Sequence, residues 1–379
     1  MASSPITRHP LTRRSVLSGA ANVMTASAFA AMGGFKALAA TEGTIGFIYV
    51  GPRDDYGWNQ AHAVAAASIA EAPGISLVEQ ERVPETEEVA RVMEGMIQLD
   101  GVKVLFPTSF GYWPFIQELA PKYPDVLFIH AGGLWKPGDQ PNTIGYRGYM
   151  EEPHYLAGIA AGHLSKTGKL GFIGAKPLYF VFNNCNGLTL GARSINPEAT
   201  TQVVITGEWN NPVKEADAVN AMIDQGVDVI CANVDSPKVA IETAERRGVM
   251  SVGYHTDQSD LAPEGFLTGA EWNWAKGGDF AMAHLTDTEF PNLYRGGFDR
   301  DMVKISPFGA AVPETVRAEV MAARDGFLDG SLLLYEGPLM DNNGNTVVED
   351  GTGVPNDDND FKLSVKWLVE GVIGETGLQ

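Results

Sequence analysis

From Thr44 onward the chain alternates between two patterns of apolar and polar residues. Short apolar runs rich in β-branched and aromatic residues are followed by longer segments whose apolar residues recur at helical spacing. The short runs are apolar almost throughout, which is typical of strands that are covered on both faces. The pattern therefore predicts an α/β protein of repeated βα units with parallel sheets. The strand-like runs are TIGFIYV, ISLVEQERV, VKVLFP, DVLFIHA, KLGFIG, TQVVITG, VDVICAN and VMSVGYH, and the helical segments include NQAHAVAAASIAEA, VARVMEGMIQL, YLAGIAAGHLSK, EADAVNAMIDQG and KVAIETAERRG.

The number of these units predicts two lobes, because so many strands exceed what one open sheet of ordinary width holds. The first lobe ends near Tyr146, in the stretch NTIGYRGYMEEPHYLAG, and a long helix begins near Glu151 with Pro153 in its first turn. No linker rich in Ser, Pro or Gly separates the lobes, so we expect short crossovers to join them and to act as a hinge. The first lobe is expected to contain residues 40–148 and about 276–312, and the second lobe residues 149–275 and about 313–379.

The C-terminal part of the chain is less regular. The stretch LLLYEGPLMDNNGNTVVEDG predicts a hairpin with a turn at Asn343-Gly344. The later stretch DFKLSVKWLVEGVIG predicts a closing helix that ends at Gly374. An acidic cluster between them lacks the alternating ligand spacing and the terminal Glu of a calcium loop, so we expect a solvated loop. The cluster consists of Asp357, Asp358 and Asp360.

Residues 1–39 have the character of an export signal. They contain no acidic residue, carry Arg13-Arg14 and continue into the apolar stretch ANVMTASAFAAM. The order LTRRSVL resembles a twin-arginine signal, and the sequence ALA before Ala40 supplies a small-x-small cleavage pattern, so we expect the mature chain to begin near Ala40. A Sec signal that happens to carry adjacent arginines is the alternative. Either route predicts export, and we expect a periplasmic protein.

We expect no membrane anchor and no nucleic-acid partner. No Cys follows the predicted cleavage site for a lipid anchor, and no later apolar run approaches the ~20 residues of a membrane helix. The net charge is −20, and it becomes −24 without the signal, which carries four basic residues. This charge is unsuited to nucleic acid, because phosphate binding requires a basic face. Cys185 and Cys231 are too few for a disulfide scaffold, although one bridge between them stays open.

Polar and aromatic residues follow the first predicted strand, in the loop GPRDDYGWNQ. In parallel α/β sheets ligands gather at the carboxyl ends of strands, where such loops converge. Capping of the next helix accounts for one of Asp54 and Asp55, and Trp58 could simply be packed in the core. A flat indole beside a carboxylate and an amide also suits a planar ligand with ring N–H donors, and we favour this interpretation. The candidate residues in this loop are Asp55, Tyr56, Trp58 and Asn59.

Similar residues stand at the ends of later predicted strands. Stacking of an aromatic ring on a heterocycle is expected to stabilise binding by ~1–3 kcal/mol, as it does with single-stranded nucleic-acid bases. Amides and carboxylates can form hydrogen bonds with the edge of the heterocycle. Neither class of residue needs to react with the ligand. The further candidates are Ser109 and Phe110 in PTSFGYW, Asn184 in FVFNNCNG, Asp235 in ANVDSP, Asp257 in GYHTDQSD and Trp272 in AEWNW.

Sequence motifs of catalysis are missing. The chain contains no G-x-S-x-G elbow, no H-E-x-x-H, no P-loop and no G-x-G-x-x-G after a strand. Its histidines lie at spacings that give no metal pair on a helix. His255 lies beside Asp257 and could touch a ligand, but a His-Asp pair alone is weak support for acid–base chemistry. We therefore predict no catalytic residue, no metal site and no cofactor.

These stretches together resemble the basic membrane protein family, which comprises periplasmic substrate-binding components of ABC transporters whose characterised members bind purine nucleosides or related bases. The resemblance spans nearly all of the expected mature chain. It is carried by DYGWNQ, where the family has D-x-x-F/W-N, and by YLAGIAAGHLSKTGKLGFIGA, GARSINP, GVDVICANVDSP, GYHTDQSDLAP and EGPLMDNNG. The resemblance implies a type I periplasmic binding protein fold, in which two Rossmann-like lobes are joined by three crossovers and hold the ligand between them.

The resemblance also implies roles for individual residues. Trp58 stands where the family has a ring that stacks on the base, with Asp55 and Asn59 beside it. Asp257 matches the acidic residue that reaches the sugar hydroxyls in nucleoside binders. Asn184 falls where those relatives tend to have a second stacking Phe, and it could hydrogen-bond the base edge instead.

One departure from the family pattern bears on the ligand. Trp272 stands where nucleoside binders commonly have a Lys that helps to hold the ribose. An indole at this position removes donors and fills volume. We therefore expect a free, adenine-like nucleobase rather than a nucleoside.

We expect a monomeric periplasmic solute-binding protein that captures a purine-type nucleobase and delivers it unchanged to the permease of an ABC importer. Closure of the lobes would be a hinge motion about the crossovers. A purine nucleoside-binding protein of the same transporter class is one alternative. A periplasmic nucleoside hydrolase that uses Asp55 and Asp257 is a second, and a sensor subunit that presents its ligand to a membrane receptor kinase is a third.

Overall fold

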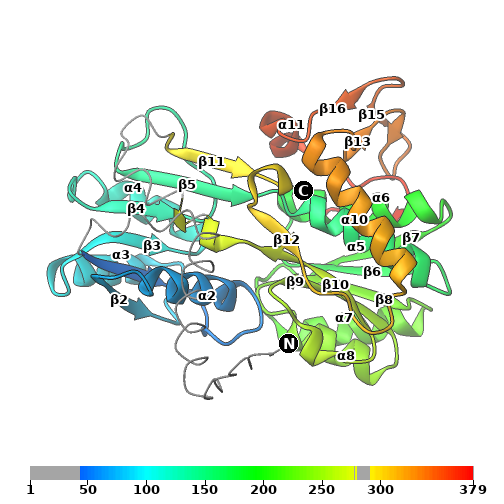
Figure 1. Cartoon of the computed structure of the whole chain (residues 1–379), viewed down its shortest axis with the longest axis horizontal. Coiled ribbons are helices and arrows are strands. Elements are labelled where there is room, and N and C mark those ends of the chain that lie inside the picture. Colours follow the sequence, from blue (N-terminus) through cyan, green and yellow to red (C-terminus); the bar gives the residue numbers. More distant parts are fainter. Residues whose placement is uncertain (1–42, 277, 280–290, 379) are drawn as a thin grey trace, which may run out of the picture.

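The computed structural model describes residues 43–276, 278–279 and 291–378. In it two sheets form two lobes, with helices packed around each sheet (Figure 1). The alternation of strands and helices follows the predicted order, and the α/β class with parallel sheets is confirmed. The predicted export signal, residues 1–39, lies outside the described residues.

The first lobe, blue to blue-green in Figure 1 apart from the yellow strand β11, is built on a six-stranded parallel sheet with the order β11-β5-β4-β3-β1-β2. Ile45 and Phe47 on β1 and Phe106 on β3 are each only 1% exposed. Helices cover both faces of the sheet, which explains why these runs are apolar throughout. The strands are β1 (Gly43–Ile48), β2 (Ile75–Gln80), β3 (Val102–Pro107), β4 (Leu127–His130), β5 (Thr143–Gly148) and β11 (Leu293–Gly296), and the helices are α2 (Trp58–Ala70), α3 (Glu87–Gln98), η2 (Phe110–Tyr112) and α4 (Trp113–Leu119).

The second lobe is built on a seven-stranded sheet with the order β12-β10-β9-β8-β6-β7-β17. Its neighbouring strands are parallel except for the edge pair of β10 and β12. Helices α5 and α6 pack very closely, since a Cβ added to Gly191 would lie 2.0 Å from the carbonyl oxygen of Tyr155. The strands are β6 (Lys169–Gly174), β7 (Thr200–Ile205), β8 (Val229–Asn233), β9 (Met250–His255), β10 (Phe266–Trp272), β12 (Val303–Ile305) and β17 (Val372–Ile373), and the helices are α5 (Glu151–Leu164), α6 (Tyr179–Ile195), α7 (Pro212–Asp224), α8 (Lys238–Arg246), η3 (Ser259–Leu261), η4 (Phe298–Arg300) and α10 (Glu314–Asp329).

The order of the strands shows where the chain passes between the two sheets. It passes after β5, between β10 and β11, and between β11 and β12. These passages correspond to the three crossovers that the resemblance implies. The segment 276–312 is assigned from sequence to the first lobe, and β11 does pair with β5 there. However, β12 lies in the second sheet, where it pairs with β10, because the turn η4 returns the chain directly after β11.

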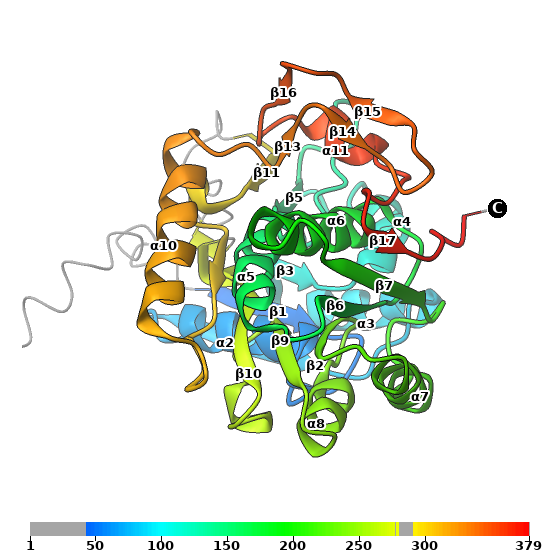
Figure 2. The same cartoon turned by 90° about the vertical axis from the view of Figure 1, so that its right-hand side faces the viewer.

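The C-terminal residues add two short antiparallel strand pairs to the second lobe, at the top of the view in Figure 2. The predicted turn at Asn343-Gly344 lies between β14 and β15, and Gly344 has the positive φ of 83° that such a turn requires. The paired strands are β13 (Tyr335–Glu336) with β16 (Gly353–Val354), and β14 (Leu339–Met340) with β15 (Thr346–Val348).

The predicted closing helix is wrong beyond its first turns. Helix α11 spans only Asn359–Ser364, and residues 372–373 form β17 at the edge of the second sheet. The apolar residues that suggested a longer helix are core residues on an irregular path, because Val365, Leu368 and Val369 are all at most 1% exposed. Tertiary burial therefore decides the backbone here, rather than the local apolar spacing.

Two further expectations concern a disulfide bond and a membrane-spanning helix. Cys185 and Cys231 are buried and free, so the bridge that the sequence left open is not formed between them. Within the described ranges, the helices are all too short or too polar to cross a membrane.

Candidate ligand-binding site

A cavity lies between the two lobes at the carboxyl ends of their strands, and it contains about 420 Å³ of empty space including its mouth. The first lobe contributes the start of α2, the residues after β3 and the end of β5, whereas the second contributes the residues that end or follow β6, β7, β8 and β9. The lining residues are Trp58, Ser109, Phe110, Arg147, Phe180, Trp209, Asn233, Val234, Asp235, Tyr254 and His255.

Aromatic rings from both lobes form much of this lining. The rings of Phe180 and Trp209 are nearly parallel, with centroids 6.2 Å apart and an angle of 5° between their planes. The ring of Phe110 from the first lobe lies 5.9 Å from that of Phe180. Aromatic side chains supply large apolar contact area together with a preferred stacking geometry. The cavity is therefore suited to a flat heterocycle.

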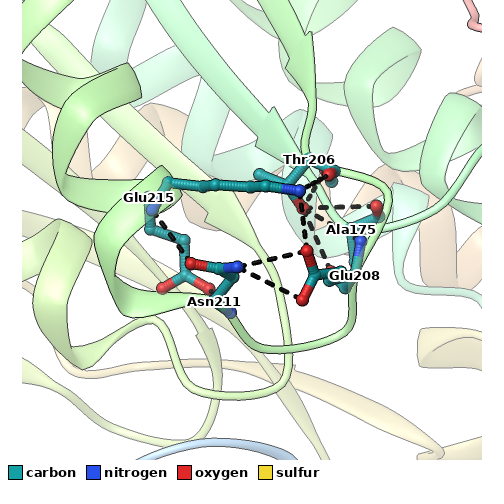
Figure 3. A network of polar contacts seen from close by, with 7 residues as sticks. Ala175, Thr206, Glu208, Asn211 and Glu215 are labelled. Atoms are coloured by element: carbon teal, nitrogen blue, oxygen red, sulfur yellow. Dashed lines mark hydrogen bonds and ion pairs between the residues drawn. The ribbon is translucent and has the colours of Figure 1, made fainter.

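The loop after β7 places Trp209 at the cavity, and a network of polar contacts holds this loop (Figure 3). Glu208 accepts hydrogen bonds from the side-chain amide of Asn211 and from Lys214, whose Nζ lies 2.6 Å from Glu208 Oε1. The hydroxyl of Thr206 donates to the carbonyl oxygen of Glu208. Asn211 also caps α7 by accepting a hydrogen bond from the backbone N–H of Lys214. Contacts outside the cavity thus hold the loop that carries Trp209.

Trp58 belongs both to the protein core and to the wall of the cavity. It is 8% exposed, and its indole N–H donates to the carbonyl oxygen of Thr108 at 3.0 Å. Other rings surround it edge-on at centroid distances of 4.8 to 5.8 Å, which fixes its orientation. Those rings are His62, His255, Trp272 and Trp274.

Asp55 and Asn59 are used by the protein itself and do not line the cavity. The Asp55 carboxylate accepts hydrogen bonds at 2.7 to 3.1 Å from the N–H groups of Gly57, Asn59 and Gln60 and from the Asn59 amide. Burial raises the pKa of Asp55, and these hydrogen bonds oppose that rise. Asn59 in turn accepts a hydrogen bond from the N–H of Gly51. Capping of α2 therefore accounts for the buried position of Asp55.

Some of the other candidates from the sequence line the cavity, and others lie outside its lining. Ser109, Phe110 and Asp235 line the cavity. Tyr56 does not, and its ring instead lies under Lys238, whose Nζ is 4.8 Å from the ring centroid.

Three further candidates lie outside the lining. Asn184 is fully buried behind the wall and donates to Asn233 Oδ1 at 3.1 Å, so any contact with a ligand would pass through Asn233. Asp257 is exposed and accepts a hydrogen bond from the N–H of Ser259. Trp272 stands behind the wall.

The site offers groups for binding rather than for acid–base chemistry. His255 donates from Nε2 to the carbonyl oxygen of Val234 at 3.0 Å and accepts at Nδ1 from the indole N–H of Trp272 at 2.7 Å. These two bonds fix a neutral ring, and burial lowers the pKa of His255 well below its usual value. The described residues also contain no group of three or more His, Cys, Asp or Glu side chains that could hold a metal ion.

Asp235 is the one carboxyl group in the lining. Burial raises its pKa well above the usual value, and the nearby charges of Asp55 and Glu85 raise it further. A carboxyl group that keeps its proton offers one donor and one acceptor to a ligand. The backbone of Asp235 also joins the two lobes, because its carbonyl oxygen accepts a hydrogen bond from the N–H of Trp58 at 2.8 Å.

Several lining residues are not among the candidates from sequence. Asn233 is the last residue of β8, Tyr254 is the second-last residue of β9, and Arg147 is the second-last residue of β5. The rule that ligands meet the carboxyl ends of parallel strands applies to these positions as well. Phe180 is the first residue of the stretch FVFNNCNG, in which Asn184 is the candidate from sequence instead. Trp209 lies in a loop with no distinguishing motif, so no sequence signal pointed to it.

The lobes touch around the cavity, so the structure is a closed form. The hydroxyl of Ser236 in the second lobe donates to the carbonyl oxygen of Asp55 in the first at 2.6 Å. A Cβ added to Gly57 would lie 1.9 Å from the carbonyl oxygen of Asp235. Only glycine at this position permits so close an approach of the two backbones.

Two lobes with parallel sheets, three passages between them and a cavity at the strand ends define the type I periplasmic binding fold. The chain belongs to the ABC transporter substrate-binding protein PnrA-like family, abbreviated Bmp, whose profile matches residues 43–321. The resemblance to the basic membrane protein family is therefore confirmed. Members of this family are solute-binding proteins, so the expectation that the protein is not an enzyme is also confirmed.

Similar proteins include relatives with different named ligands. A purine-binding protein of Brucella abortus is 34% identical over 331 residues, which are 86% of this chain and 92% of the relative. A protein of Haloferax volcanii, named for ABC transporter glucose binding, is 31% identical over 297 residues, which are 78% of this chain and 74% of the relative. The structure of an ABC transporter solute-binding protein from Aeropyrum pernix superimposes with a TM-score of 0.65 at 16% identity, covering 84% of this chain and 94% of that one. This last likeness concerns the fold alone.

Proposed function

We propose that the protein captures a free purine-type nucleobase, with the ring system of adenine, and delivers it to the permease of an ABC importer. The observation that carries the proposal is the cavity between the lobes, whose lining combines the rings of Trp58, Phe110, Phe180, Trp209 and Tyr254 with a small number of polar groups. Such a lining matches a planar, apolar ligand with hydrogen-bonding edges. The purine-binding relative from Brucella abortus supports the same ligand class.

Two placements favour a base over a nucleoside. The resemblance assigns to Asp257 the binding of the sugar hydroxyls, but Asp257 is exposed and lies outside the lining. The indole N–H of Trp272, at the position of the usual ribose-binding Lys, is occupied by His255. Neither residue offers a hydrogen-bonding group to a ribose in this closed form.

We place this activity in the periplasm, where the protein would act as a monomer that diffuses freely. The support for this location is the pattern of residues 1–39, with its adjacent arginines and small-x-small site. Binding closes the lobes, and the closed form presents a surface that the permease can distinguish from the open form.

Isothermal titration calorimetry on protein freed of ligand by reversible unfolding tests the proposal. The titrants are purine bases, the corresponding nucleosides, and glucose because of the relative from Haloferax volcanii. We expect at least one purine base to bind, its nucleoside to bind about tenfold or more weakly, and glucose to give no heat of binding. Tight binding of glucose without any purine binding would contradict the proposal.

A further inference from the structure

We propose that the cavity selects an oxopurine, a purine base with a carbonyl oxygen on its six-membered ring, over an aminopurine such as adenine, and that Arg147 reads this edge. The inference rests on the proposed function and makes its ligand more specific. It depends on two buried hydrogen-bond donors at the cavity that have no partner in the protein.

The first donor is the guanidinium group of Arg147, near the end of β5. Arg147 is 6% exposed, and it forms no hydrogen bond or ion pair with any described residue. Its Cζ lies 4.0 Å from the centroid of the Phe180 ring and 5.6 Å from that of Trp272. These cation–π contacts hold the group in place, but they leave five N–H donors without acceptors. The guanidinium nitrogens keep some accessible surface, where water can serve as their acceptor. A ligand that displaces this water has to supply acceptors in its place.

The second donor is the indole N–H of Trp209. Its Nε1 is buried and has no hydrogen-bond partner, although the ring belongs to the lining of the cavity. The indole N–H can only donate. The ring is packed between Phe180, whose centroid lies 6.2 Å away, and Lys176, whose Nζ lies 4.5 Å from the Trp209 ring centroid, and these contacts restrict its rotation.

Most acceptors in the lining are already in use. The amide oxygen of Asn233 accepts from Asn184 at 3.1 Å. Nδ1 of His255 accepts from the indole N–H of Trp272. The Ser109 hydroxyl donates to Glu85 at 2.6 Å and keeps its oxygen as an acceptor. The Asp235 carboxyl, whose pKa is raised by burial, is left to accept from one ring N–H. The free groups are thus mainly donors, and the complementary ligand presents mainly acceptors.

A second, smaller cavity borders the other side of Arg147, and its other two cations have partners in the protein. Arg295 donates to the carbonyl oxygen of Gly133 and to Asn359. Lys362 lies 2.6 Å from a carboxylate oxygen of Glu151. Arg147 is therefore the cation at these cavities that forms neither a hydrogen bond nor an ion pair with a described residue, and it lines the aromatic cavity as well.

The chemistry of the two purine classes differs at the edge that an arginine reads. A 6-oxopurine presents O6 and N7, two adjacent acceptors that match the fork of a guanidinium. Adenine presents an amino group in place of O6, so a donor would face a donor. Discrimination by such a bidentate pair corresponds to about 10- to 100-fold in affinity.

Calorimetry on the ligand-free mature protein with hypoxanthine and adenine tests the inference. These two bases differ only in the C6 substituent and the proton on the adjacent nitrogen. We expect hypoxanthine to bind about 10- to 100-fold more tightly than adenine. Equal or tighter binding of adenine would overturn the inference and leave the proposed purine function standing, whereas the absence of binding by any purine base would overturn both.

Variants then assign the selectivity to Arg147. Arg147→Met keeps the side-chain length and removes the donors, and we expect the preference for hypoxanthine to fall to about twofold or less. Arg317→Met is the matched control, because Arg317 also lies over an aromatic ring, that of Phe308, but outside the cavity. A folded Arg147→Met protein with the parental preference would overturn the role of Arg147. If this variant does not fold, Arg147→Lys, which keeps the charge but loses the fork, is expected to show the same loss of preference.

Discussion

Trp58 illustrates how a single residue of this protein can serve packing and binding together. Its indole N–H is occupied by Thr108 and its ring is surrounded by others, yet the residue still lines the cavity. A ring whose orientation is fixed before binding loses little conformational freedom when a ligand arrives. This arrangement makes Trp58 the residue on which the proposed stacking can be tested.

We expect Trp58→Ala to weaken binding of the purine ligand by roughly 1–3 kcal/mol, by analogy with stacking of bases on aromatic side chains. The substitution also leaves a gap among the surrounding rings, so thermal unfolding must show that the variant is folded at the temperature of the titration. Trp135→Ala is the control, since Trp135 is partly buried in the same lobe but does not line the cavity. A Trp58→Ala protein that binds every purine as tightly as its parent would count against the stacking role.

At the scale of elements, the start of α2 joins the two lobes. The backbone N–H of Trp58 and the carbonyl oxygen of Asp55 bond to Asp235 and Ser236 of the second lobe. The N-terminus of this helix therefore helps to form the cavity wall and the contact that closes it. Closure and binding are coupled through the same few residues.

Gly57→Ala should prevent full closure, because its Cβ would lie 1.9 Å from the carbonyl oxygen of Asp235. We expect a larger radius of gyration by small-angle X-ray scattering in the presence of ligand, and an affinity at least tenfold weaker, which is about 1.4 kcal/mol. In Gly95→Ala, the control, the new Cβ meets nothing within 4 Å on helix α3. Parental compaction and affinity in Gly57→Ala would show that this contact is not needed for closure.

The cap of α7 supports the loop that carries Trp209. Asn211→Ala removes the acceptor for the N–H of Lys214 and a donor to Glu208, and we expect a loss of about 1 kcal/mol in the free energy of unfolding. Ligand affinity should fall as well, since the loop loses part of its network. Asn210→Ala alters an exposed neighbour and should change neither quantity measurably. Unaltered stability and affinity in Asn211→Ala would mean that other contacts hold the loop.

At the scale of the whole molecule, the fold could be predicted from the apolar pattern. Strands covered on both faces have apolar runs such as GFI in β1, and helices such as α3 and α8 have clear periodicity. The prediction failed after Ser364, where Val365 and Leu368 have helical spacing but are buried along an irregular path. Long-range packing determines such a segment, and local spacing does not report it.

The lining of the cavity was less predictable than the fold. Loops after strands drew attention to Trp58 and Asp235, which do lie at the cavity. Arg147 lies within a strand, where its sequence neighbours give no sign that its charge is buried without a partner. Asp257 shows the converse, because a polar residue after a strand can turn toward solvent. The packing of the two lobes determines in which direction each of these side chains points. This packing cannot be predicted from a single sequence.

Glu152 should make the stability of the whole molecule depend on pH. It is 3% exposed beside the passage from β11 to β12, and burial raises its pKa from 4.5 to about 8, although the charge of Lys362 opposes this rise. The native state then holds this proton more tightly than the unfolded state. The group therefore lowers the free energy of unfolding as pH rises from about 4.5 to 8, by at most about 1.4 kcal/mol per pH unit.

Glu152→Gln should remove this contribution, so that the free energy of unfolding of the variant, relative to its parent, increases between pH 5 and pH 8. Urea denaturation at several pH values measures the difference. Glu118→Gln, which alters an exposed carboxylate, is the control. A difference between Glu152→Gln and its parent that does not change with pH would contradict the raised pKa.

The central claim is that the cavity between the lobes holds a purine base, and a crystal structure of the protein with hypoxanthine tests it most directly. The account predicts the base inside the cavity, in contact with the rings of Trp58, Phe180 and Trp209 and with its carbonyl oxygen within hydrogen-bonding distance of Arg147. Electron density for the base only outside this cavity, or a base whose carbonyl oxygen points away from Arg147 toward solvent, would contradict the account.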